Sequence, residues 1–159
     1  GLSDKIRIYA QEGIQTNLAI SLHAPNDEIR NQLMPINKAY PMDELREAMK
    51  FYIEQTNRRI TLEYILLKGV NDQLIHARQL AHYVKGLNAY VNLIPYNAVD
   101  EHGYQQSSLQ DVEAFKNELL RLKINVTKRK EHGRDIDGAC GQLRAKKVGE
   151  SENGNSRTN

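Results

Sequence analysis

Short apolar runs with the two-residue period of a strand alternate along this chain with amphipathic stretches that have the period of a helix. Strands are predicted at residues 17–23, 60–67, 90–94 and 124–127. Residues 5–13 have the pattern of a helix end. Pro41 is placed to begin a later helix, and Ser108 with Asp111 matches a capping box at the start of the last one. This alternation favours βα units and a parallel sheet.

The helices between these strands are expected to bury one apolar stripe each. The stripes are Met42, Leu45, Met49 and Tyr52, then Leu74, Ala77, Ala81 and Val84, and finally Leu109, Val112, Phe115, Leu119 and Leu122. The segment between the turn at residues 24–27 and Tyr40 is polar and carries no such stripe. We therefore expect helices on the flanks of the sheet and a polar connection after its first strand.

The predicted fold class is α/β, with about four mostly parallel strands and flanking helices. A complete (β/α)₈ barrel needs about 250 residues, whereas this chain has 159, so an open or partial barrel is expected. Residues 1–148 are assigned to this domain, and the polar residues 149–159 are predicted to form a disordered tail. Position 1 is glycine rather than methionine, and the N-terminus is interpreted as a cut.

Ligands of parallel α/β sheets bind at the carboxyl ends of the strands, which directs attention to residues 21–23, 66–71 and 95–97. Ser21 and His23 are two residues apart on one predicted strand and should point to the same face. They are candidates for ligand binding, or a polar pair that bonds to the backbone. The amide of Asn97 suits a ligand as well as a loop cap.

Glu63 is a carboxylate in the middle of a predicted strand, where it must be paired or face a cavity. It could line a barrel interior, or it could point between helices toward a cation such as Arg58. We treat it as structural at this point.

Several classes of site are disfavoured by the sequence. The histidines are scattered without the spacing of a zinc site, and no glycine-rich phosphate loop is present. No stretch approaches the ~20 apolar residues of a membrane helix. A single cysteine excludes an internal disulfide and fits a reducing compartment, so a cytoplasmic location is expected.

That cysteine, Cys140, lies between Gly138 and Gly141 in a hydrophilic segment. Free cysteines are usually buried, so this placement favours a reactive thiol over a core residue. Neighbouring arginines favour the thiolate, whereas neighbouring aspartates oppose it. A chance surface cysteine is the alternative, and a thiol enzyme that pairs Cys140 with His132 is a further hypothesis.

Residues 121–147 are basic, with nine lysines and arginines against three acidic residues. The net charge of this region is +6, and because the whole chain carries +2, the remainder carries −4. A basic surface of this kind could contact phosphates, which makes a non-catalytic RNA-binding module the alternative function. A solvated basic surface is the simpler interpretation.

Five motifs occur in order between residues 6 and 143. They are S-L-H-A-P-N-D at 21–27, L-M-P-I-N at 33–37, G-V-N-D at 69–72, N-L-I-P-Y-N at 92–97 and D-I-D-G-A-C-G-Q-L at 135–143. Taken together, the chain resembles the radical-SAM RNA adenine-C2 methyltransferases, enzymes with dual specificity for ribosomal and transfer RNA. The C8-methylating antibiotic-resistance enzymes are close cousins. The resemblance implies the C-terminal part of a partial (β/α)₆ radical-SAM barrel.

The resemblance also implies roles for individual residues. Ser21, Leu22, His23 and Asn97 match positions that bind S-adenosylmethionine, and Cys140 matches the cysteine that becomes S-methylated. In the family, a [4Fe–4S] cluster with an external electron donor generates the radical that activates this methyl group for addition to adenine C2. The implied substrates are 23S rRNA and tRNA.

The chain departs from the family in what it lacks. It has one cysteine, so the C-x-x-x-C-x-x-C cluster motif and the resolving cysteine are absent, and no metal ligand is assigned within it. We expect a C-terminal piece that is inactive alone, binds S-adenosylmethionine weakly, and exposes a cut barrel edge through which copies could associate. The preference between ribosomal and transfer RNA, and between C2 and C8, stays open.

Overall fold

The computed structural model describes residues 2–97 and 102–129 of the chain. In chain order, the elements of this part are α1 (Ser3–Gln11), β1 (Leu18–Ser21), α2 (Asp27–Leu33), the 3₁₀ helix η1 (Pro35–Lys38), α3 (Met42–Thr56), β2 (Ile60–Leu66), α4 (Leu74–Val84), β3 (Ala89–Pro95), α5 (Leu109–Arg121) and β4 (Val126–Lys128). Cys140, the predicted tail at 149–159 and most of the basic region 121–147 lie outside the described residues.

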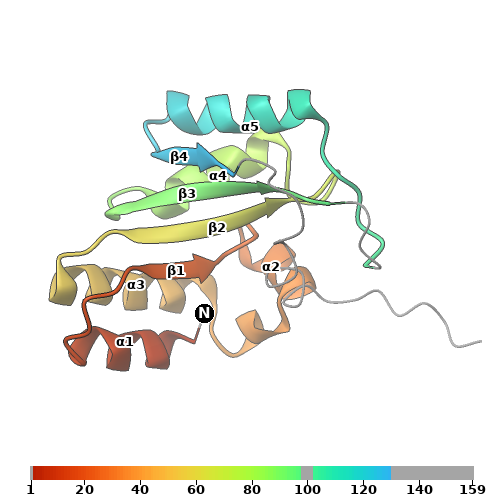
Figure 1. Ribbon diagram of the computed structural model, residues 1–159. Helices are drawn as coiled ribbons and strands as arrows, with labels where there is room; N and C mark the ends of the chain where they lie inside the picture. Colours follow the sequence, from red (N-terminus) through yellow and green to blue (C-terminus); the bar gives the residue numbers. More distant parts are fainter. Residues whose placement is uncertain (1, 98–101, 130–159) are drawn as a thin grey trace, which may run out of the picture.

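The strands form one parallel sheet in the order β1-β2-β3-β4. Each strand therefore pairs with its neighbour in sequence, and the intervening helices provide the crossovers that parallel pairing requires. The strand arrows in Figure 1 all point the same way, so their carboxyl ends share one edge. The predicted α/β fold with four parallel strands and flanking helices is confirmed.

One face of the sheet is covered by the long helices. The main hydrophobic cluster joins every second residue of the central strands, such as Leu62, Tyr64 and Leu93, to apolar side chains of α1, α3, α4 and α5. The predicted stripe of α3 is fully buried. Burial of these alternating residues fixes which side of each strand faces the helices.

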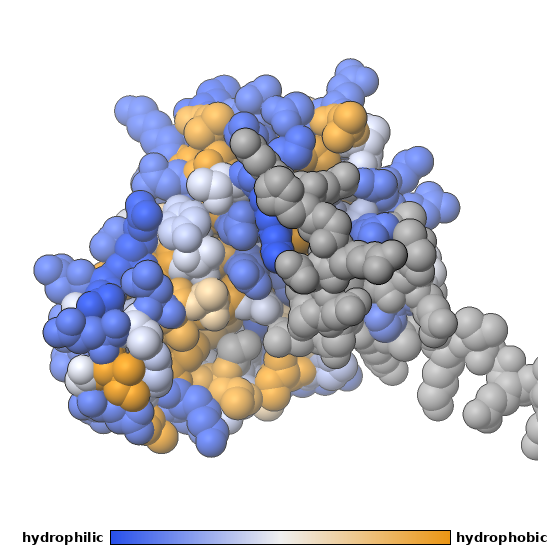
Figure 2. All heavy atoms as spheres, viewed as in Figure 1, coloured by the Kyte–Doolittle hydropathy of each residue, from blue (hydrophilic) through white to orange (hydrophobic). Residues whose placement is uncertain are grey.

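The opposite face is covered only near the carboxyl edge by described residues. There Ile65 and Ile94 pack with Leu33 and Met34 of the α2 region in a second, smaller cluster. Figure 2, viewed as Figure 1, shows largely hydrophilic and intermediate residues across the middle of this side and hydrophobic residues lower down, where β1 and α1 lie. The polar side chains of the strands therefore lie on this face.

Some expectations were wrong in detail. The segment expected to be a polar connection contains α2 and η1. Leu74 and Leu109 were assigned to buried stripes but are 44% and 73% exposed, because each is the first residue of its helix and lies beyond the packed face. The N-cap half of the expected capping box is present, since the Ser108 hydroxyl accepts a hydrogen bond from the Asp111 amide. The Asp111 carboxylate accepts from the Ser108 hydroxyl. No helix in the described part of the chain is long and apolar enough to cross a bilayer.

Candidate functional site

The first candidate segment, Ser21 to His23, lies where β1 ends. The amides of Leu22 and His23 both donate to the carbonyl of Glu63, at 2.9 and 3.3 Å. The backbone of His23 has a φ of 57°, a left-handed conformation that few residues other than glycine adopt. The expectation that Ser21 and His23 share one strand face was therefore wrong, because the chain leaves the strand before His23.

The imidazole of His23 is fully buried and joins the first two strands. Its Nδ1 accepts a hydrogen bond from the amide of Ile65 at 3.0 Å. A neutral ring with an accepting Nδ1 carries its proton on Nε2. Within residues 2–97 and 102–129, this buried Nε2 has no hydrogen-bond partner. His23 thus offers one unused donor at the strand ends.

Burial lowers the pKa of His23 to about 3, and the positive charge of Arg30 adds to this effect. The ring is therefore neutral at physiological pH and unsuited to act as a general acid. Its contribution is a hydrogen bond that joins two strands.

Arg30 on α2 holds the same segment from the other side. Its Nε donates to the Leu22 carbonyl at 3.1 Å and its Nη2 to the Ser21 carbonyl at 3.2 Å. The remaining guanidinium nitrogen, Nη1, donates to Asn37 Oδ1 at 2.8 Å. Arg30 is completely buried. Sequence reasoning missed this residue, because a charged side chain in a polar segment is usually exposed.

Asn37 connects Arg30 to the start of α3. Its Nδ2 donates to Asp27 Oδ1 at 2.8 Å and to Asn31 Oδ1 at 2.9 Å. Asp27 Oδ1 also accepts the Met42 amide at 2.9 Å. The positive charge of Arg30 is therefore balanced through an intervening amide, and the polar network sets the position of α2 and α3 relative to the strand end.

Asn71 completes the support of this edge from the loop after β2. Its side-chain Nδ2 donates to the carbonyls of His23 and Ile65, both at 2.8 Å, and its Oδ1 accepts the Leu67 amide at 2.8 Å. The hydroxyl of Tyr64 donates to the Asn71 carbonyl at 2.7 Å. Every polar atom of the amide is used, so Asn71 fixes the ends of β1 and β2 together.

Asn97 follows β3 by two residues and is exposed at the same edge of the sheet. The parallel topology thus brings Ser21, His23 and Asn97 to one rim, as the sequence predicted. The backbone carbonyls of residues 21–23 accept hydrogen bonds from Arg30 and Asn71, and the amides of residues 22 and 23 donate to the Glu63 carbonyl. A ligand at this rim would therefore bind chiefly to side chains.

Glu63 lies in a polar row across the face that the long helices leave open. The sheet register aligns Ser21 with Glu63, Glu63 with Asn92, and Asn92 with Thr127. Glu63 is half-buried, and among described residues its carboxylate has no ion pair. Arg58, the proposed cation, instead donates to Asn17 Oδ1 at 3.5 Å. The alternative in which Glu63 pairs with Arg58 is therefore not formed in the described part of the chain.

Within the described residues, no group of three or more histidine, cysteine, aspartate or glutamate side chains could hold a metal ion.

Known proteins share most of this sequence and the fold. The probable dual-specificity RNA methyltransferases RlmN of Staphylococcus carnosus and Geobacillus kaustophilus are each 58% identical to the chain over 146 residues. The chain matches this family along most of its own length. The alignment covers 92% of the chain but 40% of either relative. No family model matches the chain.

The crystal structure of a radical SAM methyltransferase from Sphaerobacter thermophilus has the same fold. It superposes with a TM-score of 0.83 and 43% identity, over 92% of this chain and 43% of that one. The chain thus spans about two fifths of the length of the dual-specificity RNA methyltransferases it matches. The resemblance carried by the five sequence motifs is confirmed at the level of family and fold.

The buried histidine predicts acid sensitivity. An unfolded chain binds a proton at His23 near pH 6.5, whereas the folded chain does so only near pH 3. Protons therefore favour unfolding, and stability falls as the pH falls below 6.5, by up to about 1.4 kcal/mol per pH unit. Urea unfolding followed by circular dichroism between pH 7 and pH 5 measures this slope.

The matched control is His23→Asn, because asparagine keeps an acceptor near Nδ1, tolerates a left-handed backbone and does not titrate. We expect the variant to lose most of the slope above pH 5. An unchanged slope would show that other groups cause the acid sensitivity.

Proposed function

We propose that this chain is part of a radical-SAM enzyme that methylates C2 of adenine in RNA and carries the methyl group on Cys140. The observation that supports this most strongly is the 58% identity with dual-specificity RNA methyltransferases over 92% of the chain. The same fold in a radical SAM methyltransferase supports it independently. By this proposal, 23S rRNA and tRNA are the substrates.

The strand-end residues fit S-adenosylmethionine, a ligand with ribose hydroxyls, an adenine and an amino-acid group. The hydroxyl of Ser21 has no partner among described residues, and the buried Nε2 of His23 is an orphaned donor. Asn97 can donate and accept at the same rim. We propose that Ser21, Leu22, His23 and Asn97 hold this ligand, with Arg30 and Asn71 keeping the segment in place.

When bound, S-adenosylmethionine supplies the methyl group and, after reductive cleavage at a [4Fe–4S] cluster, the radical. The role of Cys140 is to accept the methyl group as a thiolate, the nucleophilic form of cysteine. Adenine C2 is electron-poor, so a polar methyl transfer from a donor to this carbon is disfavoured. A sulfur-bound methyl carried by the protein provides another route.

The proposal is tested with the complete protein that contains this chain. We expect the cluster-loaded protein to form 2-methyladenosine in 23S rRNA and tRNA, measured by mass spectrometry of RNA digests, and Cys140→Ala to form none. Initial rates with the two RNAs as competitors measure substrate preference. Methylation that persists in Cys140→Ala would contradict the assigned carrier, and 8-methyladenosine as sole product would contradict the assigned carbon.

The 159-residue chain alone should be inactive. Three cysteines hold a cluster of this type by ligation in the proposed family, and the chain has only Cys140. After reconstitution with iron and sulfide, we expect no absorbance of a bound cluster and no methylated RNA. Turnover by the pure chain with Cys140 intact would refute this prediction.

A further inference from the structure

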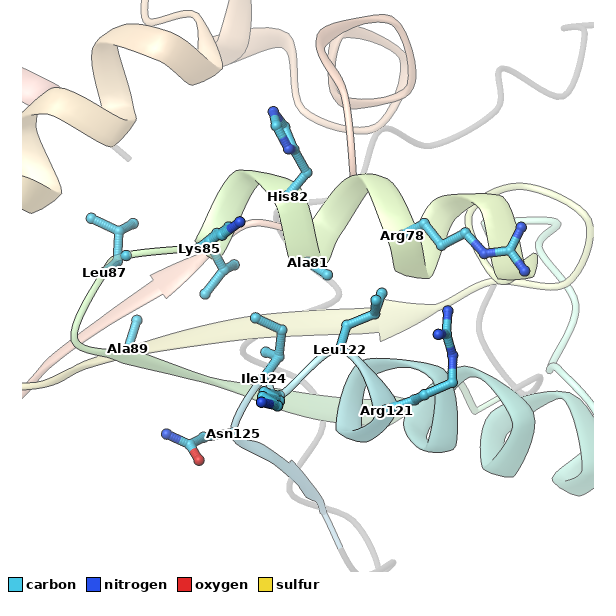
Figure 3. A pocket seen from close by; sticks show the side chains of 13 residues that line it. Arg78, Ala81, His82, Lys85, Leu87, Ala89, Arg121, Leu122, Ile124 and Asn125 are labelled. Atoms are coloured by element: carbon cyan, nitrogen blue, oxygen red, sulfur yellow. The ribbon is translucent and has the colours of Figure 1, made fainter.

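A second concave surface lies between α4 and α5, at the opposite end of the strands from the rim described above. Its volume is about 660 Å³, and segments that precede β3 and β4 help to line it. Figure 3 shows the apolar side chains of Ala81, Leu122 and Ile124 within it. Arg78 and Arg121 lie at one end of it, and Lys85 lies toward the other.

The cations of this surface outnumber the acids. Arg78, Lys85, Arg121 and Lys123 line it, and no aspartate or glutamate is among the described lining residues. Glu118 lies behind the two arginines and binds both, at 2.8 Å to Arg78 and 2.7 Å to Arg121. Four cations and one carboxylate leave a net charge of +3. We call the surface formed by these four cations the basic groove.

Basic residues at helix ends often serve only to bind the terminal carbonyls. Here other groups do that work. Arg46 donates to the Tyr83 and Lys85 carbonyls at the end of α4. Backbone amides close the end of α5, with Lys123 donating to the Leu120 carbonyl at 2.9 Å. Within the described residues, the side-chain amines of Lys85 and Lys123 have no partner and remain available.

Lys123 also occupies an unusual backbone position. Its φ of 62° is left-handed, a conformation in which a helix end normally has glycine or asparagine. A lysine at this position is less favourable for folding than either of those residues. A role for its positive charge in the basic groove would explain why lysine occupies this position.

We propose that the basic groove binds the phosphate backbone of RNA; this inference rests on the proposed function and adds to it a second contact. The groove and the rim lie at opposite ends of β3, whose seven residues span roughly 20 Å. A long polyanion can reach both places, whereas a small anion cannot. No phenylalanine, tyrosine or tryptophan lines the groove among described residues, and His82 is the one imidazole there. We therefore expect the contact to depend on the charge of the phosphates rather than on base stacking.

The test uses the 159-residue chain and a fluorescein-labelled stem–loop RNA with unpaired adenosines, followed by anisotropy over a range of NaCl concentrations. The variant Lys85→Gln/Lys123→Asn removes both free amines, and asparagine suits the backbone of position 123. The control Lys5→Gln/Lys50→Gln removes two exposed charges from α1 and α3. The remaining basic residues are common to all three proteins.

We expect the groove variant to bind RNA about tenfold more weakly near 0.1 M salt, with a salt slope smaller by about 1.5. Its melting temperature should equal or exceed that of the parent. Weaker RNA binding by the variant could then not be attributed to unfolding. Adenosine monophosphate should compete weakly, which distinguishes a polymer site from a nucleotide site.

Equal affinities for the groove variant and the control would overturn the inference, as would absence of RNA binding by the chain or full competition by the mononucleotide. Methylation by the complete protein is measured separately. If the complete protein methylates RNA but the groove substitutions leave RNA affinity unchanged, the RNA-binding role of the groove is refuted and the proposed function stands. Weaker RNA binding in the variant, without any methylation by the parent, would refute the proposed function alone.

Discussion

Replacing Arg30 with methionine is expected to lower the free energy of unfolding by about 3–5 kcal/mol, as removal of one partner from a buried charged network does. The substitution leaves the carbonyls of Ser21 and Leu22 and the Oδ1 of Asn37 without their donor. Each unsatisfied buried acceptor costs about 1–3 kcal/mol. Because small domains are stable by only about 5–15 kcal/mol, this loss is a large fraction of the total and should lower the urea midpoint markedly.

Arg46→Met is the matched control for this experiment. Arg46 also donates to two carbonyls, those of Tyr83 and Lys85, but it is only half-buried and water can replace it. We expect a loss of at most about 1 kcal/mol there. Urea unfolding followed by circular dichroism is suitable because the chain lacks tryptophan. Equal losses for the two variants would show that the buried network around Arg30 has no special importance.

Asn71→Asp should lower the free energy of unfolding by at least about 3 kcal/mol at pH 7, although the two side chains have the same shape. The Nδ2 of Asn71 donates to the carbonyls of His23 and Ile65. Aspartate places an oxygen there, so two donated bonds become repulsions and a charge is buried without a partner.

The control is Asn88→Asp, which makes the same chemical change at an exposed loop position and should alter stability by less than about 0.5 kcal/mol. A thermal melt near neutral pH compares the two variants. If Asn71→Asp melts within a few degrees of the parent, the amide is not the connection between β1 and β2 that its contacts indicate.

The sheet could be predicted from sequence because its strands carry a simple signal. The central strands are buried on the helix side at every second residue, as in residues 60–66, and turn residues bound them. The predicted and observed limits of these two strands differ by at most one residue. The shorter β1 was overextended, because nothing in the letters Ser-Leu-His reveals a left-handed backbone at His23.

The residues that support the site could not be found in this way. Asn26 caps α2 through its side chain, a signal that was present in the sequence, but the helix is short and its buried side includes a charged residue, Arg30. Hydrophobic periodicity therefore could not predict α2 as a helix. The roles of Asn37 and Asn71 depend on partners far along the chain, which a local pattern does not contain. The rim itself was predictable, because strand direction alone determines which ends meet.

The bond between the Ile65 amide and the His23 ring joins two nitrogens, whereas amides in a sheet normally face a carbonyl oxygen. Such a pair should transmit a scalar coupling between the two ¹⁵N nuclei in a magnetic resonance spectrum. In a ¹⁵N-labelled chain, the Ile65 resonance is then an internal reporter of the strand ends that needs no attached probe. Its exchange with deuterated solvent should match that of the deepest core amides, and a ligand at the rim should shift it before any global change is visible.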